Sequence, residues 1–287
     1  MEYVNPDALV SAEWLAAHLG DASVRVVDAT WYGPGARDAR HEFENAHIPG
    51  AVHFDIAEIC DRDTPIVHQI PGPAQFARQV STLGLGNGHR IVVYDRSGYY
   101  CAGARVWWMF RVFGHENVTL LDGGMAKWLA DGRTTEAGGP TPAPANFTAR
   151  MNAGLVRGLA DMLANLETEA EQVVDARNAD AFAGRESEPW GVKKDGHIPG
   201  SVHLHGVRLV DRERGGALRS ADEIAAAFAG AGLDLAKPIV VSCGSGVIAG
   251  LGAFGLYLLG HENVPVYDGS WAEWGAADET PAETGGA

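Results

Sequence analysis

Cys243 has the sequence setting of a reactive cysteine, in the segment VVSCGSGVIAG at 240–250. An apolar, β-branched run ends at this residue, and Gly244, Ser245 and Gly246 follow it. A strand-to-helix turn of this kind can hold a side chain at a sheet edge with backbone N–H groups directed at it. Those dipoles and the positive end of the next helix would stabilise a thiolate, the reactive form of cysteine. The alternative is a small buried thiol beside a tight turn, which is common for free cysteines.

The chain contains an internal repeat whose parts keep their order. HIPGAVHFD at 47–55 returns as HIPGSVHLH at 197–205, and VVDA, IVVxxxSG and GHENV also recur. A long-period repeat of this kind indicates a duplicated domain. The segment AGGPTPAPAN is rich in Pro, Gly and Ala, which is typical of a linker. We therefore expect domains at 1–136 and 147–287, joined by a linker at 137–146.

Short apolar runs alternate with longer helical patterns in each copy. Runs such as VRVVDA, IVVYD, QVVDA and PIVVSC predict parallel strands that are buried on both faces. Ser220 followed by Glu223 predicts a capped helix over 220–232. The alternation predicts an α/β fold of two tandem domains, each a mostly parallel sheet flanked by helices. Ligands of such sheets bind beyond the carboxyl ends of the strands, where Cys243 is expected.

The first copy carries a carboxylate where the second carries a thiol. Alignment of the copies sets Asp95 opposite Cys243 within the same kind of turn. Because a carboxylate needs solvation or partners, we expect this position to be accessible in both copies, which favours a chemical role for Cys243. This comparison gives no support for a chemical role of Cys60 or Cys101, and we expect both to be non-catalytic.

The composition narrows the class of protein and its partners. A net charge of −15, from 37 acidic and 22 basic residues, disfavours binding to nucleic acid or to anionic membranes. Three cysteines without a close pair form neither a disulfide framework nor a zinc motif, which favours a reducing compartment. The N-terminal residues lack a signal-peptide pattern, and no apolar run is long enough to span a membrane. These features predict a soluble, cytoplasmic protein.

Several motifs together carry a resemblance to a known family. The paired HIPG motifs, the CGSGV loop, WWMFRVFGHENV at 107–118 and YDGSWAEW at 267–274 resemble two-domain sulfurtransferases of the rhodanese superfamily. The resemblance runs from about Val10 to Ala276. The uncharged CGSGV loop is similar to the 3-mercaptopyruvate sulfurtransferase branch, whereas the thiosulfate branch typically has basic residues after the cysteine. The resemblance implies that Cys243 takes a sulfur atom from a small thiol donor as a persulfide. A thiol, cyanide or thioredoxin-like acceptor then removes that sulfur, and no metal or organic cofactor is implied.

The resemblance also assigns roles to further residues. Ser245 matches a loop serine of the family, and His68 matches a histidine that works with it from the first domain. The acidic member of that group falls at Ala57, so neighbouring Glu58 or Asp61 are the candidates to replace it. The loop backbone that would cradle the persulfide comprises Gly244, Gly246, Val247, Ile248 and Ala249.

The donor-binding positions depart from the family pattern. Two arginines that hold the donor carboxylate in the family correspond to Ala181 and Trp190 here, so charge-assisted contacts are lost. Trp190 could instead offer an aromatic wall to a bulkier, less anionic donor. Ile248 stands where the family usually has Thr. Nearby basic side chains that could compensate are Arg185, Lys193 and Lys194.

Three alternatives to a mercaptopyruvate-type enzyme remain open at this point. The first is a thiosulfate sulfurtransferase. The second is a persulfide carrier or interaction protein with little turnover on small donors, which the missing arginines favour. The third is a phosphatase of the same fold, which is disfavoured because that chemistry needs an Arg six residues after the Cys, where Ala249 stands.

Overall fold

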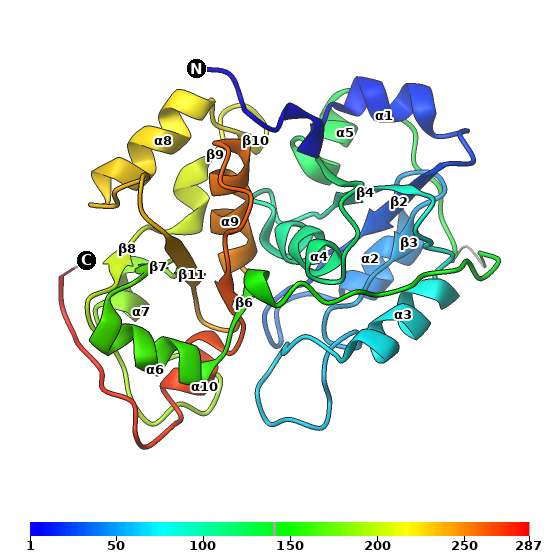
Figure 1. The fold of residues 1–287 in the computed structure, drawn as a ribbon. Helices are drawn as coiled ribbons and strands as arrows, with labels where there is room; N and C mark the ends of the chain where they lie inside the picture. The colour runs from blue at the N-terminus through cyan, green and yellow to red at the C-terminus, as the bar shows by residue number, and fades with distance from the viewer. Residues whose placement is uncertain (140–141, 287) are drawn as a thin grey trace.

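The structure is a computed structural model that describes residues 1–139 and 142–286. The chain forms two halves of one design, each built on a five-stranded parallel sheet with helices around it (Figure 1). Within the described residues, no helix is long and apolar enough to cross a membrane.

The sheet of the first half has the strand order β1–β5–β4–β2–β3. Its strands are Leu9–Val10 (β1), Val24–Asp28 (β2), Val52–His53 (β3), Arg90–Tyr94 (β4) and Val118–Leu121 (β5). Its helices are Ala12–His18 (α1), Ala39–Asn45 (α2), Pro73–Thr82 (α3), Cys101–Val112 (α4) and Gly124–Ala130 (α5), with a 3-10 turn at Pro6–Ala8 (η1). Along β4, Ile91 and Val93 pack with α3 and α4, whereas Val92 and Tyr94 pack with α1, α2 and α5. Both faces of the sheet are therefore buried, as the continuous apolar runs predict.

The second half repeats this order as β6–β12–β11–β7–β8. Its strands are Val156–Arg157 (β6), Gln172–Asp175 (β7), Val202–His203 (β8), Ile239–Ser242 (β11) and Val266–Tyr267 (β12). Its helices are Leu159–Thr168 (α6), Ala179–Phe182 (α7), Ala221–Gly230 (α8), Ala249–Leu258 (α9) and Ser270–Trp274 (α10), with 3-10 turns at Ala153–Leu155 (η2) and Gly206–Leu209 (η3). A small antiparallel pair, Val210–Asp211 (β9) and Ala217–Leu218 (β10), extends this half. The matching orders confirm the duplicated α/β domain, and Ser220 with Glu223 forms the predicted capping box of α8.

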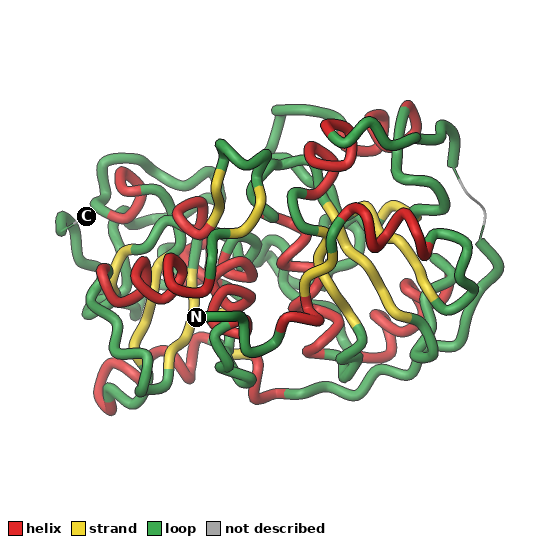
Figure 2. The backbone as a smooth tube through the Cα atoms, turned by 90° about the horizontal axis from the view of Figure 1, so that it is seen from above, coloured by secondary structure: helices red, strands yellow, loops and turns green. Residues whose placement is uncertain are grey.

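Helices α4 and α9, one from each half, pack against each other at the centre of the molecule (Figure 1). A Cβ atom at Gly250 would lie only 2.7 Å from the backbone N of Arg105, so this close approach requires glycine. One turn further on, the rings of Trp107 and Phe254 meet edge to face at 4.8 Å. The view from above shows the two sheets on either side of this contact (Figure 2). One hydrophobic core consequently includes residues of both halves.

The predicted linker lies against the first half. Its residues Pro140 and Thr141 are outside the described part of the chain. Beyond them, the backbone runs along the first half, where the N–H of Arg150 donates to the carbonyl of Phe113 at 2.9 Å (Figure 1). The first strand of the second sheet begins only at Val156.

The C-terminal segment lies along the surface of the second half. Glu283 forms an antiparallel bridge with His197, and the indole N–H of Trp274 donates to the carbonyl of Pro281 at 2.7 Å. Ala287 lies outside the described residues.

Candidate active site

Cys243 follows the last residue of β11, at the carboxyl edge of the second sheet. The backbone N–H groups of Ser245 and Ala249 reach its sulfur, and Ala249 is the first residue of α9. The turn depends on Gly246, whose φ is +76° and whose Cβ, if present, would lie 2.5 Å from the carbonyl oxygen of Asp268. The expected strand-to-helix turn with inward amides is therefore present.

The resting charge of Cys243 differs from the sequence-based expectation. Burial raises the pKa of this thiol above its ordinary value, and the N–H groups of Ser245 and Ala249 offset only part of that effect. The negative charges of Asp175 and Glu188 raise the pKa further. The amides therefore favour the thiolate, as predicted, but desolvation of the charged sulfur outweighs them, and the pKa stays above its ordinary value.

A cleft of about 270 Å³ opens in front of Cys243 between the two halves. The first half supplies three of its lining side chains: Trp31, Tyr99 and Cys101. The second half supplies Ala176, Arg177, Asn178, Glu188, Trp190, His205, Cys243, Gly244, Ser245, Val247 and Ile248. The sulfur of Cys243 thus faces a space whose walls exist only when both halves are packed together, as ligand sites at domain interfaces commonly do.

Arg105 on α4 connects the first half to the cysteine loop. Its guanidinium forms a buried ion pair with Asp268 at 2.6 Å and donates to the carbonyl of Gly246 at 3.2 Å. It also donates to the carbonyl of His68 at 2.6 Å. Asp268 in turn accepts the N–H of Ile70 at 2.9 Å. One buried cation therefore fixes the cysteine loop against the His68 segment.

His68 lies behind the cleft rather than among its lining residues. Its ring meets Trp31 and Trp190, both of which line the cleft, edge to face at 4.8 and 5.7 Å. Burial, followed by the charge of Arg105, lowers the pKa of His68 to about 4, so its ring is neutral at pH 7. No described contact joins its ring to Ser245, and its Nδ1 atom makes no hydrogen bond within the described residues.

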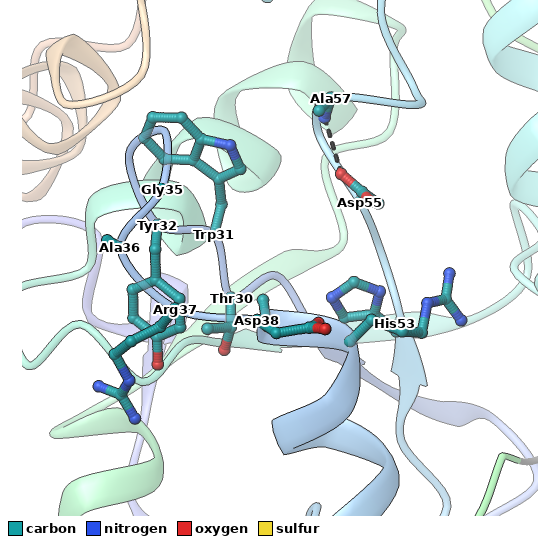
Figure 3. A pocket seen from close by; sticks show the side chains of 12 residues that line it. Thr30, Trp31, Tyr32, Gly35, Ala36, Arg37, Asp38, His53, Asp55 and Ala57 are labelled. Carbon is teal, nitrogen blue, oxygen red and sulfur yellow. Dashed lines mark hydrogen bonds between the residues drawn. The ribbon is translucent and has the colours of Figure 1, made fainter.

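The carboxylate whose charge acts on His68 is Asp55, which the sequence comparison did not select. Asp55 follows β3 beside a hollow of about 480 Å³ in the first half, where it accepts the N–H of Ala57 at 2.9 Å (Figure 3). Of the two expected substitutes, Glu58 is exposed and paired with Arg62 at 2.6 Å. Asp61 accepts the N–H of its neighbour at position 63. In the sequence, Asp55 is the last residue of the first HIPG motif, HIPGAVHFD, and this position could have identified it as a site residue.

The stretch before the second HIPG motif places Trp190 in the cleft together with a carboxylate. The indole N–H of Trp190 donates to Oε2 of Glu188 at 3.0 Å. Glu188 lies over the cysteine loop, because a Cβ at Gly244 would be 2.9 Å from its Oε2. Burial is the largest influence on Glu188 and raises the pKa of its carboxyl group. Sequence reasoning named Trp190 and overlooked Glu188, whose place between two charged residues gave little indication of burial.

The basic side chains expected to replace the missing arginines lie elsewhere. Arg185 is exposed and pairs with Asp180 at 2.7 Å, so the expectation that it contacts the donor is corrected. Lys193 pairs with Asp278 at 2.7 Å, and Lys194 donates to backbone carbonyls of the C-terminal segment. Ala181 is buried on α7. The cation that does line the cleft is Arg177, the residue after the second VVDA motif.

The accessibility expected at this aligned position is absent from both copies, since Cys243 is 1 % exposed and Asp95 is buried as well. Asp95 is 5 % exposed, and its carboxylate accepts the N–H and hydroxyl of Ser97 and the N–H of Gly103 at 2.7 to 2.9 Å. Partners rather than solvent therefore satisfy this carboxylate. Cys60 and Cys101 are both buried, although Cys101 reaches the cleft wall.

The match to known proteins covers both halves. Rhodanese-like domains match residues 11–131 and 159–277, and the chain belongs to this family. It is 44% identical to human 3-mercaptopyruvate sulfurtransferase and 41% identical to bovine thiosulfate sulfurtransferase, each over 93% of this chain and 91% of the relative. Its structure is similar to that of SseA from Escherichia coli, described as a 3-mercaptopyruvate sulfotransferase, with a TM-score of 0.84 and 38% identity. That similarity covers 92% of this chain and 98% of the other. The chain is accordingly a two-domain sulfurtransferase, which takes sulfur from a donor and passes it to a thiol acceptor.

Proposed function

We propose that the chain transfers a sulfane sulfur from a small, 3-mercaptopyruvate-like thiol donor to an acceptor through a persulfide on Cys243. The observation that carries this proposal is the position of Cys243 at the carboxyl edge of β11, with two loop amides on its sulfur and a cleft before it. The loop from 244 to 249 contains no Lys or Arg. That loop supports the 3-mercaptopyruvate branch over the thiosulfate branch.

The reaction proceeds in two nucleophilic steps. In the first, the Cys243 thiol gives up its proton to solvent, the resulting thiolate attacks the donor sulfur, a new S–S bond forms, and the carbon–sulfur bond breaks. The carbon fragment leaves as an enolate, which takes up a proton and becomes pyruvate when the donor is 3-mercaptopyruvate. In the second, an acceptor thiolate attacks the outer sulfur, and the bonding pair returns to Cys243.

The surrounding residues have distinct proposed roles. The amides at Ser245 and Ala249 hold the sulfur on Cys243, and those of Gly244, Gly246, Val247 and Ile248 surround the outer sulfur. The Ser245 hydroxyl is a hydrogen-bond donor to the bound substrate. His68 acts as a neutral ring behind the cleft, since its pKa is lowered to about 4. Trp190 forms part of the substrate wall.

The two domains have different roles in this proposal. The domain at 1–136 is non-catalytic, with Asp95 fully bonded at the cysteine position, and it contributes Trp31 and Tyr99 to the cleft. The domain at 147–287 carries the reaction. A thioredoxin-like dithiol is the proposed acceptor, and a reducing, cytoplasmic location is supported by three free thiols.

Two alternatives make different predictions in one experiment. Purified, reduced protein is exposed separately to 3-mercaptopyruvate and to thiosulfate, and its release of sulfur to cyanide is measured. Turnover with 3-mercaptopyruvate supports the proposal, and turnover with thiosulfate alone assigns the thiosulfate activity. A persulfide carrier, favoured by Ala181 and Trp190 at the donor positions, would take sulfur from another persulfidated protein but show no turnover with either compound.

A further inference from the structure

Arg177 has one guanidinium nitrogen that is not used by the protein. Its Nε and Nη2 donate to Asp175 at 2.6 to 3.0 Å, and Nη2 also donates to the carbonyl of Gly196. The guanidinium lies over the ring of Trp271, 4.7 Å from its centroid. Nη1 makes no hydrogen bond within the described residues, although the Arg177 side chain is only 4 % exposed. Because Arg177 lines the cleft, Nη1 is available to a ligand that enters it.

Glu188 lies beside this nitrogen without bonding to it. Its Oε1 is 3.7 Å from Nη1 of Arg177, beyond hydrogen-bond distance, while its Oε2 accepts the indole N–H of Trp190 at 3.0 Å. The Cys243 sulfur is within range of the Arg177 charge, and the Glu188 charge in turn acts on that sulfur. A ligand carboxylate bound to Nη1 would therefore lie close to the cysteine and within a few ångströms of Glu188.

Two ionised carboxylates at this spacing would repel each other in a partly buried site. A proton on one of them removes the repulsion, as in carboxylate pairs that share a site. Glu188 is suited to hold that proton, because burial, the largest influence, raises the pKa of its carboxyl group. The charge of Arg177 offsets part of this effect, and those of Asp175 and Glu186 add to it. A ligand carboxylate on Nη1 would raise the pKa of Glu188 further.

The other titratable groups at the cleft are uncharged at neutral pH. Burial raises the pKa of the Cys243 thiol and lowers the pKa of His205, which also lines the cleft. His68, behind Trp190, has a pKa lowered by burial to about 4. Arg212 is exposed and is not among the lining residues, although its charge reaches His205. His205 is thus the second group on which an incoming carboxylate would favour a proton.

We propose that the donor carboxylate binds Nη1 of Arg177 together with a proton on Glu188, so that donor binding takes up a proton from solution. This inference rests on the proposed 3-mercaptopyruvate-like donor. The protonated carboxyl group donates to the donor carboxylate, and its other oxygen keeps the N–H of Trp190. Arg177 thereby supplies the cation that is missing at Ala181 and Trp190. Because the complex binds more protons than the free protein, affinity for a carboxylate ligand weakens as the pH rises.

Protection of Cys243 from iodoacetamide by pyruvate measures this binding without turnover. The apparent Kd is the pyruvate concentration that halves the alkylation rate, determined at several pH values on either side of neutrality. Comparison within each pH cancels the pH dependence of the thiol itself. Pyruvate stays ionised throughout, and pyruvamide is the uncharged comparison. Sulfur uptake from 3-mercaptopyruvate is measured separately by intact mass.

We expect the Kd for pyruvate to rise with pH in the wild type, approaching about tenfold per pH unit for one linked proton, and the Kd for pyruvamide to stay constant. Glu188→Gln mimics the protonated carboxyl group, with an oxygen for the Trp190 N–H and an N–H for the ligand. Its Kd for pyruvate should be at least about tenfold below that of the wild type at the highest pH and independent of pH.

Glu186→Gln is the matched control, because Glu186 is exposed and a glutamine oxygen can still accept the Asn178 side-chain N–H. It should keep the pH dependence of the wild type. Arg177→Lys keeps a positive charge beside Asp175 but offers no second nitrogen to the ligand, so pyruvate binding should weaken at least about tenfold at the lowest pH. Thermal melts verify the fold of each variant, and Glu188→Gln decides the proposal if Arg177→Lys does not fold.

The outcomes separate this inference from the function on which it rests. Wild-type protein that gains no sulfur from 3-mercaptopyruvate would refute the proposed function, and this inference with it. Protein that gains the sulfur but shows less than a threefold change in the Kd for pyruvate across the pH range would overturn the proton uptake alone. A pH dependence that persists in Glu188→Gln would assign the proton to another group, such as His205, and overturn the role of Glu188. Unweakened binding in folded Arg177→Lys would overturn the carboxylate site.

Discussion

Replacement of Arg105 by Met tests how the cysteine loop is held in place. Methionine approximates the length of the arginine stem, so the main loss is the guanidinium with its bonds to Asp268, Gly246 and His68. The Asp268 carboxylate would then keep only the N–H of Ile70 among these partners. The substitution therefore leaves a buried carboxylate without its cation.

The expected cost follows from that burial. Arg105 and Asp268 are 1 and 5 % exposed in their side chains, and removing one partner of a buried ion pair typically costs about 3 to 5 kcal/mol. For a chain of 287 residues that unfolds in one step, this corresponds to a decrease in Tm of about 5 to 8 °C. Persulfide formation should slow as well, because the Gly246 and His68 segments lose their shared anchor.

The assay is urea unfolding of the wild type, Arg105→Met, Asp268→Asn and the double variant. The double variant should be more stable than the sum of the single losses predicts, since the second change removes the unpaired charge. A loss of less than about 1 kcal/mol in Arg105→Met would refute the reasoning, because such a value is typical of an exposed pair.

Three further predictions concern the site. The rate of alkylation of Cys243 by iodoacetamide should rise with pH, with a midpoint above the ordinary thiol pKa. Glu188→Gln should move this pH profile to lower pH, because a negative charge that disfavours the thiolate is removed. An unchanged profile would contradict this prediction. Gly246→Ala should slow persulfide formation at least about tenfold, because Gly246 has φ of +76° and a Cβ there would lie 2.5 Å from a carbonyl oxygen. Gly98→Ala is the control, since Gly98 has φ of +74° but open space around it. That variant should lose only about 1 kcal/mol of stability and keep the rate of persulfide formation. The His68 ring should titrate near pH 4 by NMR. The unfolded chain binds the proton at a higher pH, about 6.5, so the contribution of His68 to folding stability should fall as the pH drops from about 6.5 toward 4. A titration midpoint near 6.5 would contradict this, because it would show an exposed ring.

The fold could be predicted from the sequence because the repeat identifies the same strands twice. Strands β4 and β11 each contain a continuous apolar run, residues 91–94 and 239–241, which is typical of strands buried on both faces. The edge strands β1, β3, β6 and β8 escaped prediction, since each has two residues and carries no periodicity. Their pairing is decided by the neighbouring strand rather than by their own sequence.

The sequence predicts only those parts of the candidate site whose residues lie together in one segment of the chain. The Cys243 loop is local, so its glycines and its place after a strand are readable from the chain. Trp31 and Tyr99 reach the cleft because α4 packs on α9, and no local pattern encodes that contact. The sequence-based placement of Arg185 near the donor was wrong because Asp180, five residues earlier, pairs with it at the surface.

The central claim is that Cys243 carries the transferred sulfur, and intact mass tests it most directly. Reduced protein and the Cys243→Ser variant are each exposed to 3-mercaptopyruvate, freed of small molecules and weighed. The account predicts a gain of one sulfur atom in the wild type, its removal by cyanide, and no gain in Cys243→Ser. The same gain in Cys243→Ser would contradict the account, because the sulfur would then reside on another group.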